Sequence, residues 1–373
     1  RFRPLECEET PLSKQLAAAR RERIVSICRQ RQLAAVLVYG NAWRCDYLRY
    51  VTDFAQFEGH GAALVEPGRV RLYLESRADA ERASAQADGV EAVWLADFFG
   101  DLRRIVEAEA GAGPIGVAPA SQLPFGLIDA LARPSVDVTR DFDQALRLKL
   151  AGEVDAVRRA AQLADEGYEE FCRAARAGRM EYEVVADLER FFRSRGCPDN
   201  FMIMASGGVD IRAMHPPGAK QLAVGELVTT ELTPCIEGYY AQICRTLVIG
   251  PPSKAQQAAF DVHLEALEVG LAAVRPGVTG GQLARLQNDV FRRHGLGEYT
   301  TSEYTRVRGH GLGLYVDSSP PILEEDETVL APGMTLIVHP NGYHPDAGYL
   351  VLGDAVVVRD DGYELLTATP RKL

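Results

Sequence analysis

Two polar side chains capable of acid–base or binding chemistry fall on one predicted β-hairpin. A segment rich in β-branched residues turns at residues 237–238 and continues as a second apolar strand. In a hairpin folded at that turn, Glu231 and Gln242 project from the same face, because side chains alternate along a strand. Tyr240 and Cys244 lie at alternate positions beside Gln242. A carboxylate and an amide on an otherwise apolar hairpin indicate a functional site, and a solvated sheet face is the alternative interpretation.

Three histidines complete the set of candidate proton carriers. His215 precedes two prolines on the loop before the hairpin, His310 lies between two glycines, and His339 ends an apolar strand. An imidazole titrates near neutral pH, so each of them can exchange protons. The alternatives are a loop histidine for His215 and hydrogen-bonded core histidines for the other two. Glu231 has the strongest functional claim, because a carboxylate in an apolar strand is costly unless a group such as an imidazole pairs with it.

Two regions of different pattern must position these residues. Residues 1–145 alternate short apolar runs with helical patterns, which predicts an α/β domain. Residues 146–373 begin with two long helical patterns and continue with strands, the hairpin and further helices. We therefore predict an α/β (α+β) protein of two domains with these bounds. In the first domain, Glu58 and His60 are the titratable pair that could take part in chemistry, and a surface histidine is the alternative for His60.

Composition and charge exclude several classes of function. The chain has 373 residues, 47% of them hydrophobic, which is enough to bury a core in each of two domains. A net charge of -11 and a pI near 5.3 argue against nucleic acid as a partner. Seven cysteines without a CxxC pair indicate neither a disulfide framework nor a thiolate zinc site. No stretch approaches the roughly 18 apolar residues of a membrane span, so we expect a cytoplasmic protein without membrane contact.

Five short motifs, taken in order, resemble those of the creatinase, prolidase and aminopeptidase P family. They are HPP at 215–217, GYYAQICRT at 238–246, GHGLGLYVD at 309–317, PGMTLIVHP at 332–340 and GYLVLGD at 348–354. The resemblance covers essentially the whole chain. It implies an N-terminal creatinase-type α/β domain followed by a C-terminal pita-bread domain.

The resemblance also implies where metal ligands would lie. Metallopeptidases of this family hold two divalent ions with two aspartates on the hairpin, the histidine of the GHG block and two glutamates on the last strands. The matching positions are Glu231, Gln242, His310, His339 and Gly353. Two neighbouring hard cations require bridging carboxylates, and an amide and a hydrogen replace them here. We therefore predict no metal cofactor. A single softer divalent ion held by Glu231, His310 and His339 is the alternative.

Metal-free hydrolases of the same family, creatinase among them, move protons with a histidine on the loop before the hairpin, and His215 occupies that place. Tyr240 matches a tyrosine that contacts the substrate in creatinase. Cys244 and His339 stand where creatinase has two carboxylates for its guanidinium substrate, so we do not expect creatinase activity. Asp317 replaces the second histidine of the peptidase pattern, which helps to hold the peptide.

Together these features predict a creatinase-like, metal-independent hydrolase that cleaves a C–N bond in a small amino-acid-like or amide substrate. The predicted catalytic residues are His215, Glu231, His310 and His339, and the predicted substrate-binding residues are Tyr240, Gln242, Cys244, Asp317, Glu58 and His60. The alternatives are a lyase or biosynthetic tailoring enzyme on the same scaffold, and a catalytically inactive binding module. The resemblance further implies a homodimer in which Glu58 and His60 of one chain approach the partner's site.

Overall fold

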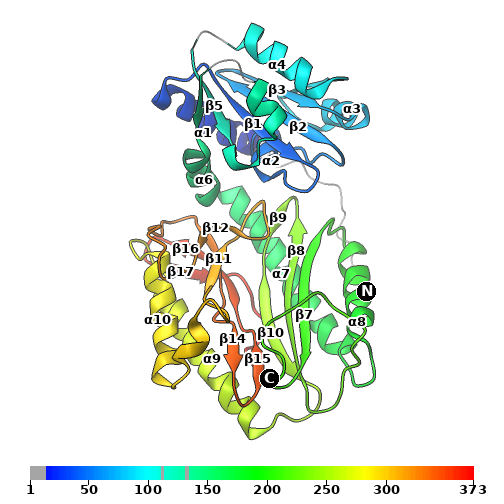
Figure 1. Ribbon diagram of the computed structural model, residues 1–373, viewed down its shortest axis with the longest axis vertical. Coiled ribbons are helices and arrows are strands. Elements are labelled where there is room, and N and C mark those ends of the chain that lie inside the picture. The colour runs from blue at the N-terminus through cyan, green and yellow to red at the C-terminus, as the bar shows by residue number, and fades with distance from the viewer. Residues whose placement is uncertain (1–13, 111–112, 131–133) are drawn as a thin grey trace. The chain divides into compact units, whose positions relative to one another are not determined.

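A computed structural model of the protein describes residues 14–110, 113–130 and 134–373 (Figure 1). These residues form two compact units, an N-terminal unit that extends to Leu146 and a C-terminal unit from Arg147 to Leu373. Each unit combines helices with β-sheet, which confirms the predicted mixed α/β class. In the described residues, no helix combines the length and the apolar composition that crossing a membrane requires.

The N-terminal unit is built on a six-stranded sheet in the order β4-β3-β2-β1-β5-β6. Its elements are α1 (Lys14–Arg31), β1 (Ala35–Asn41), α2 (Asp46–Thr52), β2 (His60–Glu66), β3 (Arg69–Leu74), α3 (Arg77–Gln86), β4 (Glu91–Trp94), α4 (Phe98–Glu109), β5 (Ile115–Ala118), η1 (Ala120–Gln122), α5 (Phe125–Ala130), β6 (Ser135–Asp137) and α6 (Thr139–Arg147). The central strands β1 and β2 are buried on both faces, which explains why they read as continuous apolar runs. The hairpin of β2 and β3 turns at Gly68, whose φ of 81° favours glycine.

The C-terminal unit contains three sheets. Its elements are α7 (Ala151–Ala174), α8 (Glu181–Arg193), β7 (Asn200–Gly207), β8 (Leu227–Ile236), β9 (Tyr239–Tyr240), β10 (Ile243–Val248), α9 (Lys254–Ala272), α10 (Gly280–Arg293), η2 (Gly297–Thr300), β11 (Gly309–Gly311), β12 (Ser318–Pro321), β13 (Thr335–Val338), β14 (Gly342–His344), β15 (Gly348–Leu350), β16 (Asp354–Arg359) and β17 (Gly362–Leu365). One sheet has the order β10-β8-β7 with β9 paired to β8, a second has the order β12-β11-β13-β16-β17, and β14 pairs with β15. The single strand predicted after the hairpin turn is therefore divided into β9 and β10.

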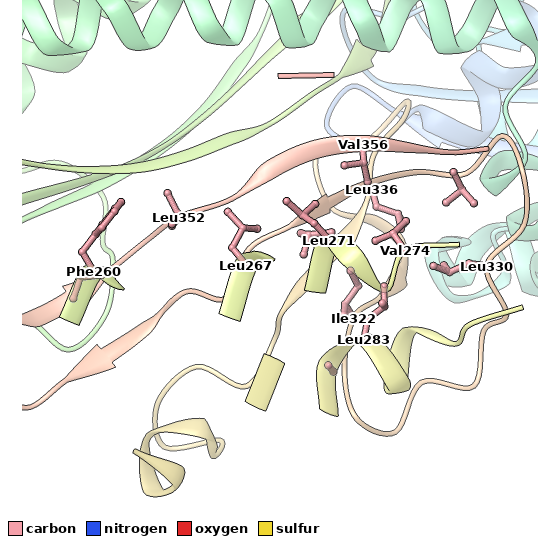
Figure 2. Packing of buried hydrophobic residues seen from close by; sticks show 14 of the residues in the cluster. Phe260, Leu267, Leu271, Val274, Leu283, Ile322, Leu330, Leu336, Leu352 and Val356 are labelled. Carbon is pink, nitrogen blue, oxygen red and sulfur yellow. The ribbon is translucent and has the colours of Figure 1, made fainter. Parts of the chain in front are cut away.

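Helices on the outside of these sheets hold the C-terminal unit together. Residues of α9 and α10, such as Leu267, Leu271 and Leu283, pack with Leu336 of β13 and Val356 of β16 in one apolar cluster (Figure 2). The fully buried members of this cluster each stabilise the fold by roughly 1.5–3 kcal/mol through removal of apolar surface from water. The core therefore fixes β13 and β16, the two strands next to the predicted site residues.

Candidate active site

The register of several chain segments brings predicted polar residues onto one sheet face. Glu231 of β8 lies directly opposite Cys244 of β10, and the hairpin turns at residues 237–238 as predicted. Cys244 exchanges two backbone hydrogen bonds with Gly353, which precedes β16. A Cβ atom on Gly353 would lie 2.5 Å from the Cβ of His339. Because directly opposed residues point to the same side of a sheet, Glu231, Cys244 and His339 share one face, named here the site face.

His310 reaches the site face from β11. The register pairs it with Ile337, two positions before His339, so both imidazoles project from the same side. Their ring centroids are 5.4 Å apart in an edge-to-face arrangement. A Cβ atom on Gly309 or on Gly311 would lie 2.1 Å from a backbone oxygen, so glycine is required on both sides of His310.

Glu231 is a buried carboxyl held by an amide that the sequence motifs did not indicate. Nδ2 of Asn341 donates a hydrogen bond to Oε1 of Glu231 over 2.6 Å. Burial raises the pKa of Glu231 to about 7, although hydrogen bonds from neighbours such as Cys244, Asn341 and Gln242 act in the opposite direction. At neutral pH the carboxyl is therefore divided between its protonated and ionised forms, which is the condition for a general acid–base group.

The two imidazoles are neutral at physiological pH and differ in their hydrogen bonding. Nδ1 of His310 donates to the Gly311 carbonyl over 2.9 Å, which leaves Nε2 as an acceptor. Burial lowers the pKa of His310, while the carboxylate of Asp317, 3.7 Å from Nδ1, acts in the opposite direction. Burial lowers the pKa of His339 well below its ordinary value. In the described part of the chain, the buried Nδ1 of His339 has no hydrogen-bond partner, so it is available to a ligand.

Asn341 and Tyr349 belong to this site, although sequence reasoning missed both. Asn341 is held in place because its backbone oxygen accepts from Arg308 and its side-chain oxygen accepts from the amide of Leu352. Burial raises the pKa of the Tyr349 phenol, and the charge of nearby Glu231 adds to that effect. No local sequence signal identifies Asn341, because residues 339–341 lie between β13 and β14 and the backbone amide of Asn341 donates to the His339 carbonyl in a turn.

The reverse side of the hairpin is braced by a buried ion pair. Nη2 of Arg245 donates to Oδ1 of Asp354 over 2.7 Å, and both side chains are at most 1% exposed. The same guanidinium donates to the carbonyls of Cys244 and Gly353. Arg245 is therefore a structural residue that pairs behind the hairpin.

His215 and Tyr240 have hydrogen-bond partners outside the Glu231 network. His215 bridges Met204 of β7 through its backbone, and Nδ1 of its ring donates to the Pro216 carbonyl over 2.8 Å. The hydroxyl of Tyr240 donates to Asp199 over 2.6 Å. The predicted residues that the structure brings together are Glu231, Gln242 and Cys244 in one network, and His310, His339 and Asp317 in another. The roles of all these residues stay predictions.

Glu58 and His60 lie in the N-terminal unit. Nδ1 of His60 is 2.7 Å from the hydroxyl of Tyr39, and its ring centroid is 5.1 Å from that of Phe99. Glu58 accepts a hydrogen bond from the hydroxyl of Ser76 over 2.8 Å. Their approach to a partner's site, and the homodimer itself, stay predictions that light scattering can test.

The donors on the site face do not match a pair of divalent ions. Of the five positions that the resemblance assigns to metal ligands, only Glu231 carries a carboxylate. Gly353 offers no side chain and has no room for one beside His339. Within the residues described, no group of three or more His, Cys, Asp or Glu side chains is arranged to hold a metal ion. The alternative of a single ion held by Glu231, His310 and His339 is therefore not supported either. We therefore assign no step of the chemistry to a bound metal.

Comparison with known proteins places this geometry in a family. Residues 155–360 match the family described as Metallopeptidase family M24. An Xaa-Pro dipeptidase of Pyrococcus horikoshii is 28% identical over 285 residues, which cover 74% of this chain and 79% of the relative. The crystal structure of the prolidase from the same organism has a TM-score of 0.84 at 25% identity and covers 95% of this chain and 99% of that one. An Xaa-Pro dipeptidase from Bacillus anthracis has a TM-score of 0.83 at 28% identity and covers 96% of this chain and 99% of its own.

These findings confirm the resemblance and correct one prediction. We predicted an enzyme without a cofactor, and this prediction is wrong, because the matched family is one of metallopeptidases and its relatives include Xaa-Pro dipeptidases. The prediction failed because it considered the side chains at the matching positions alone. The family match spans more than half of the sequence and the shared fold nearly all of it, so this chain is a peptidase-type hydrolase that belongs to metallopeptidase family M24.

Proposed function

We propose that this hydrolase cleaves a C–N bond in a short peptide or small amide, and that Glu231 is its principal proton carrier. One observation carries the proposal, which is that the Glu231 carboxyl is buried on the site face and has a pKa raised to about 7. We therefore give Glu231 the role that the sequence motifs assigned to His215. The ring of His215 already donates to the adjacent Pro216 carbonyl.

In the proposed mechanism, ionised Glu231 accepts a proton from the water that attacks the scissile carbonyl carbon. The same carboxyl, now protonated, donates that proton to the departing nitrogen as the C–N bond breaks. The 2.6 Å bond from Asn341 holds the carboxyl in one orientation, so both proton transfers occur without reorganisation of the side chain.

The two imidazoles are proposed to bind the amide group of the substrate. Nε2 of His310 can accept from a substrate N–H, because Nδ1 of that ring donates to Gly311. Nδ1 of His339 is buried without a partner in the described residues, and a substrate polar group would satisfy it. Neutral imidazoles around one half-ionised carboxyl suit an uncharged amide better than a guanidinium.

Peptides of two residues are the first substrates to test, because several relatives are named Xaa-Pro dipeptidase. Release of free amino acids from a dipeptide panel measures the activity. The change Glu231→Gln should lower turnover by about two to four orders of magnitude, since it removes the proton carrier and keeps the shape. Glu268→Gln, an exposed carboxylate on α9, is the matched control and should leave turnover unchanged.

Two outcomes decide the proposal. A Glu231→Gln variant that melts like the native protein and retains full turnover would refute it. Loss of turnover in His215→Gln with little loss in Glu231→Gln would return the proton-transfer role to His215. Elemental analysis of the same preparations measures bound metal, because family membership and the donors on the site face point in opposite directions.

A further inference from the structure

We propose that Arg308 and Asn288 are positioning residues, which hold Asn341 against Glu231 through a buried hydrogen-bond network that extends to helix α10. This inference rests on the proposed function and deepens it, because it names two residues away from the site face on which turnover depends. Both side chains are at most 1% exposed, so they act on the reaction through Asn341 and not by contact with the substrate.

The segment that carries Asn341 does not belong to a strand. Residues 339–341 lie between β13 and β14, and the backbone amide of Asn341 donates to the His339 carbonyl over 2.7 Å in a turn. In a strand, the alternation of the backbone fixes the direction of each side chain, and a turn has no such alternation. The direction of the Asn341 amide must therefore be set by contacts from other segments.

Arg308 supplies the main contacts to this segment. Nη1 of Arg308 donates to the backbone oxygen of Asn341 over 2.6 Å, and the Arg308 carbonyl accepts from the backbone amide of His339 over 3.1 Å. Oδ1 of Asn341 accepts from the backbone amide of Leu352 over 3.1 Å, which turns Nδ2 toward Glu231. Arg308 thus fixes both ends of the segment, and Leu352 aims the amide.

Asn288 of α10 holds Arg308 in turn. Nε of Arg308 donates to Oδ1 of Asn288 over 2.5 Å, and the guanidinium carbon lies 4.9 Å from the centroid of the Phe291 ring. Nδ2 of Asn288 donates to Oε1 of Glu324 over 2.5 Å, and the same oxygen accepts from Nη2 of Arg292 over 2.6 Å. The network therefore runs from the site face through α10 to a partly exposed ion pair.

The partner of Arg308 differs from that of a purely structural arginine. A buried guanidinium is costly unless a partner offsets its charge. Where this chain braces the hairpin, Arg245 pairs directly with the carboxylate of Asp354. Arg308 instead binds the amide of Asn288, which aligns the guanidinium with Asn341 and leaves its charge in place. The neutral partner makes this arrangement costlier than a direct ion pair, which supports a role in orienting the site beyond that of a brace.

The test replaces Asn288, because this change leaves the side chain of Arg308 in the protein. Asn288→Ala removes the acceptor for Nε of Arg308. We expect kcat on the best substrate of the dipeptide panel to fall about tenfold and KM to stay within about twofold of the native value, since positioning acts on the transition state more than on binding. Asn288→Asp keeps an acceptor oxygen at the same place and should restore most of the turnover.

Gln287→Ala is the matched control. Gln287 is a buried amide on the same helix, and its Nε2 donates to the Leu283 carbonyl. Its replacement should lower the melting temperature as Asn288→Ala does and should leave kcat unchanged. Loss of stability is thereby separated from loss of positioning.

The side-chain amide of Asn341 provides a readout that needs no substrate. In nuclear magnetic resonance spectra of nitrogen-15-labelled protein, its signal is the side-chain amide that Asn341→Ser removes. The amide proton that bonds Glu231 should resonate downfield of the other proton on the same nitrogen, because its acceptor is a carboxyl oxygen at 2.6 Å. Asn288→Ala should move this signal toward that of a solvent-exposed amide, Asn288→Asp should return it, and Gln287→Ala should leave it in place.

The outcomes separate this inference from the proposed function. An Asn341 signal that keeps its native position in Asn288→Ala would overturn the inference, as would unchanged turnover by that variant or equal losses in Gln287→Ala. If the native protein cleaves no dipeptide of the panel, the Asn341 signal decides. If Asn288→Ala loses turnover and moves the signal while Glu231→Gln retains full turnover, the positioning role stands and the proposed role of Glu231 fails. Loss of turnover in Glu231→Gln with none in Asn288→Ala would give the reverse conclusion.

Discussion

The buried carboxyl of Glu231 makes a prediction about stability that does not depend on knowing the substrate. Its pKa is about 7 in the folded protein, against an ordinary value of 4.5. Because the pKa of Glu231 is higher in the folded than in the unfolded protein, folding stabilises the protonated carboxyl. The contribution of Glu231 to the free energy of unfolding is complete below pH 4.5 and is lost as the pH rises through 7. With pKa values of 4.5 in the unfolded and about 7 in the folded protein, the free energy of unfolding falls by about 2.5 kcal/mol between pH 5 and pH 8.

The change Glu231→Gln removes this titration and keeps a neutral side chain of the same size. For a unit of 150–250 residues, each kcal/mol shifts the melting temperature by about 2–4 °C. We therefore expect the melting temperature of the native protein to fall by about 5–10 °C more than that of the Gln variant between pH 5 and pH 8. Scanning calorimetry of both proteins at both pH values, with a chelator present throughout, measures this double difference.

The double difference isolates Glu231 from other buried groups. His263, His310 and His339 have lowered pKa values and change stability with the opposite sign, but they are present in both proteins and cancel. An identical shift of melting temperature in the native protein and in Glu231→Gln would refute the reasoning. It would show that the carboxyl is already ionised at pH 5.

Three further predictions follow from buried groups near the site. Arg245→Met should lower the free energy of unfolding by about 3–5 kcal/mol, because it leaves the buried charge of Asp354 without this partner. Denaturant titration measures this loss, and a negligible loss would contradict the prediction. His263 has a pKa lowered to about 4, so its stabilising contribution is present above pH 6.5 and is lost as the pH falls through 4. Between pH 6.5 and pH 3, the free energy of unfolding of His263→Gln should therefore fall by about 3 kcal/mol less than that of the native protein. Thermal melting at each pH measures this difference. Gly353→Ala should lower both the melting temperature and turnover, because its Cβ would lie 2.5 Å from that of His339; an unchanged variant would mean that the two segments move apart without cost.

The part of the site that follows from local periodicity could be predicted from the sequence. Once the hairpin turn was located at residues 237–238, the alternation of side chains placed Glu231 and Gln242 on one face, and the structure has that register. This inference uses residues that one turn connects. The close approach of other backbone segments to Gly309 and Gly311, on either side of His310, is by contrast seen only in the structure.

The residues that sequence reasoning missed depend on contacts between distant segments. Asn341 is a site residue because its amide meets Glu231, which is 110 positions away. Tyr349 is near Glu231 although the two residues lie on β15 and β8, which no shared sequence pattern links. No local periodicity carries such information, because the pairing is set by how the sheets of the C-terminal unit pack. The same limit explains why the side chains at the matching ligand positions could not establish whether the protein uses a metal cofactor.

The substitutions at the matching positions fit together physically. Gly353 has no Cβ, and the space that a side chain would need there lies against His339. Glu231 is one carbon longer than the aspartate that the resemblance implies at this position, and its carboxyl is held by Asn341 at 2.6 Å. Burying that carboxyl costs several kcal/mol, and the hydrogen bonds from Asn341, Cys244 and Gln242 offset only part of the cost. A chain that needed Glu231 only for packing would be more stable with an apolar residue there. The buried carboxyl therefore supports the proposed role of Glu231 as a proton carrier on this face.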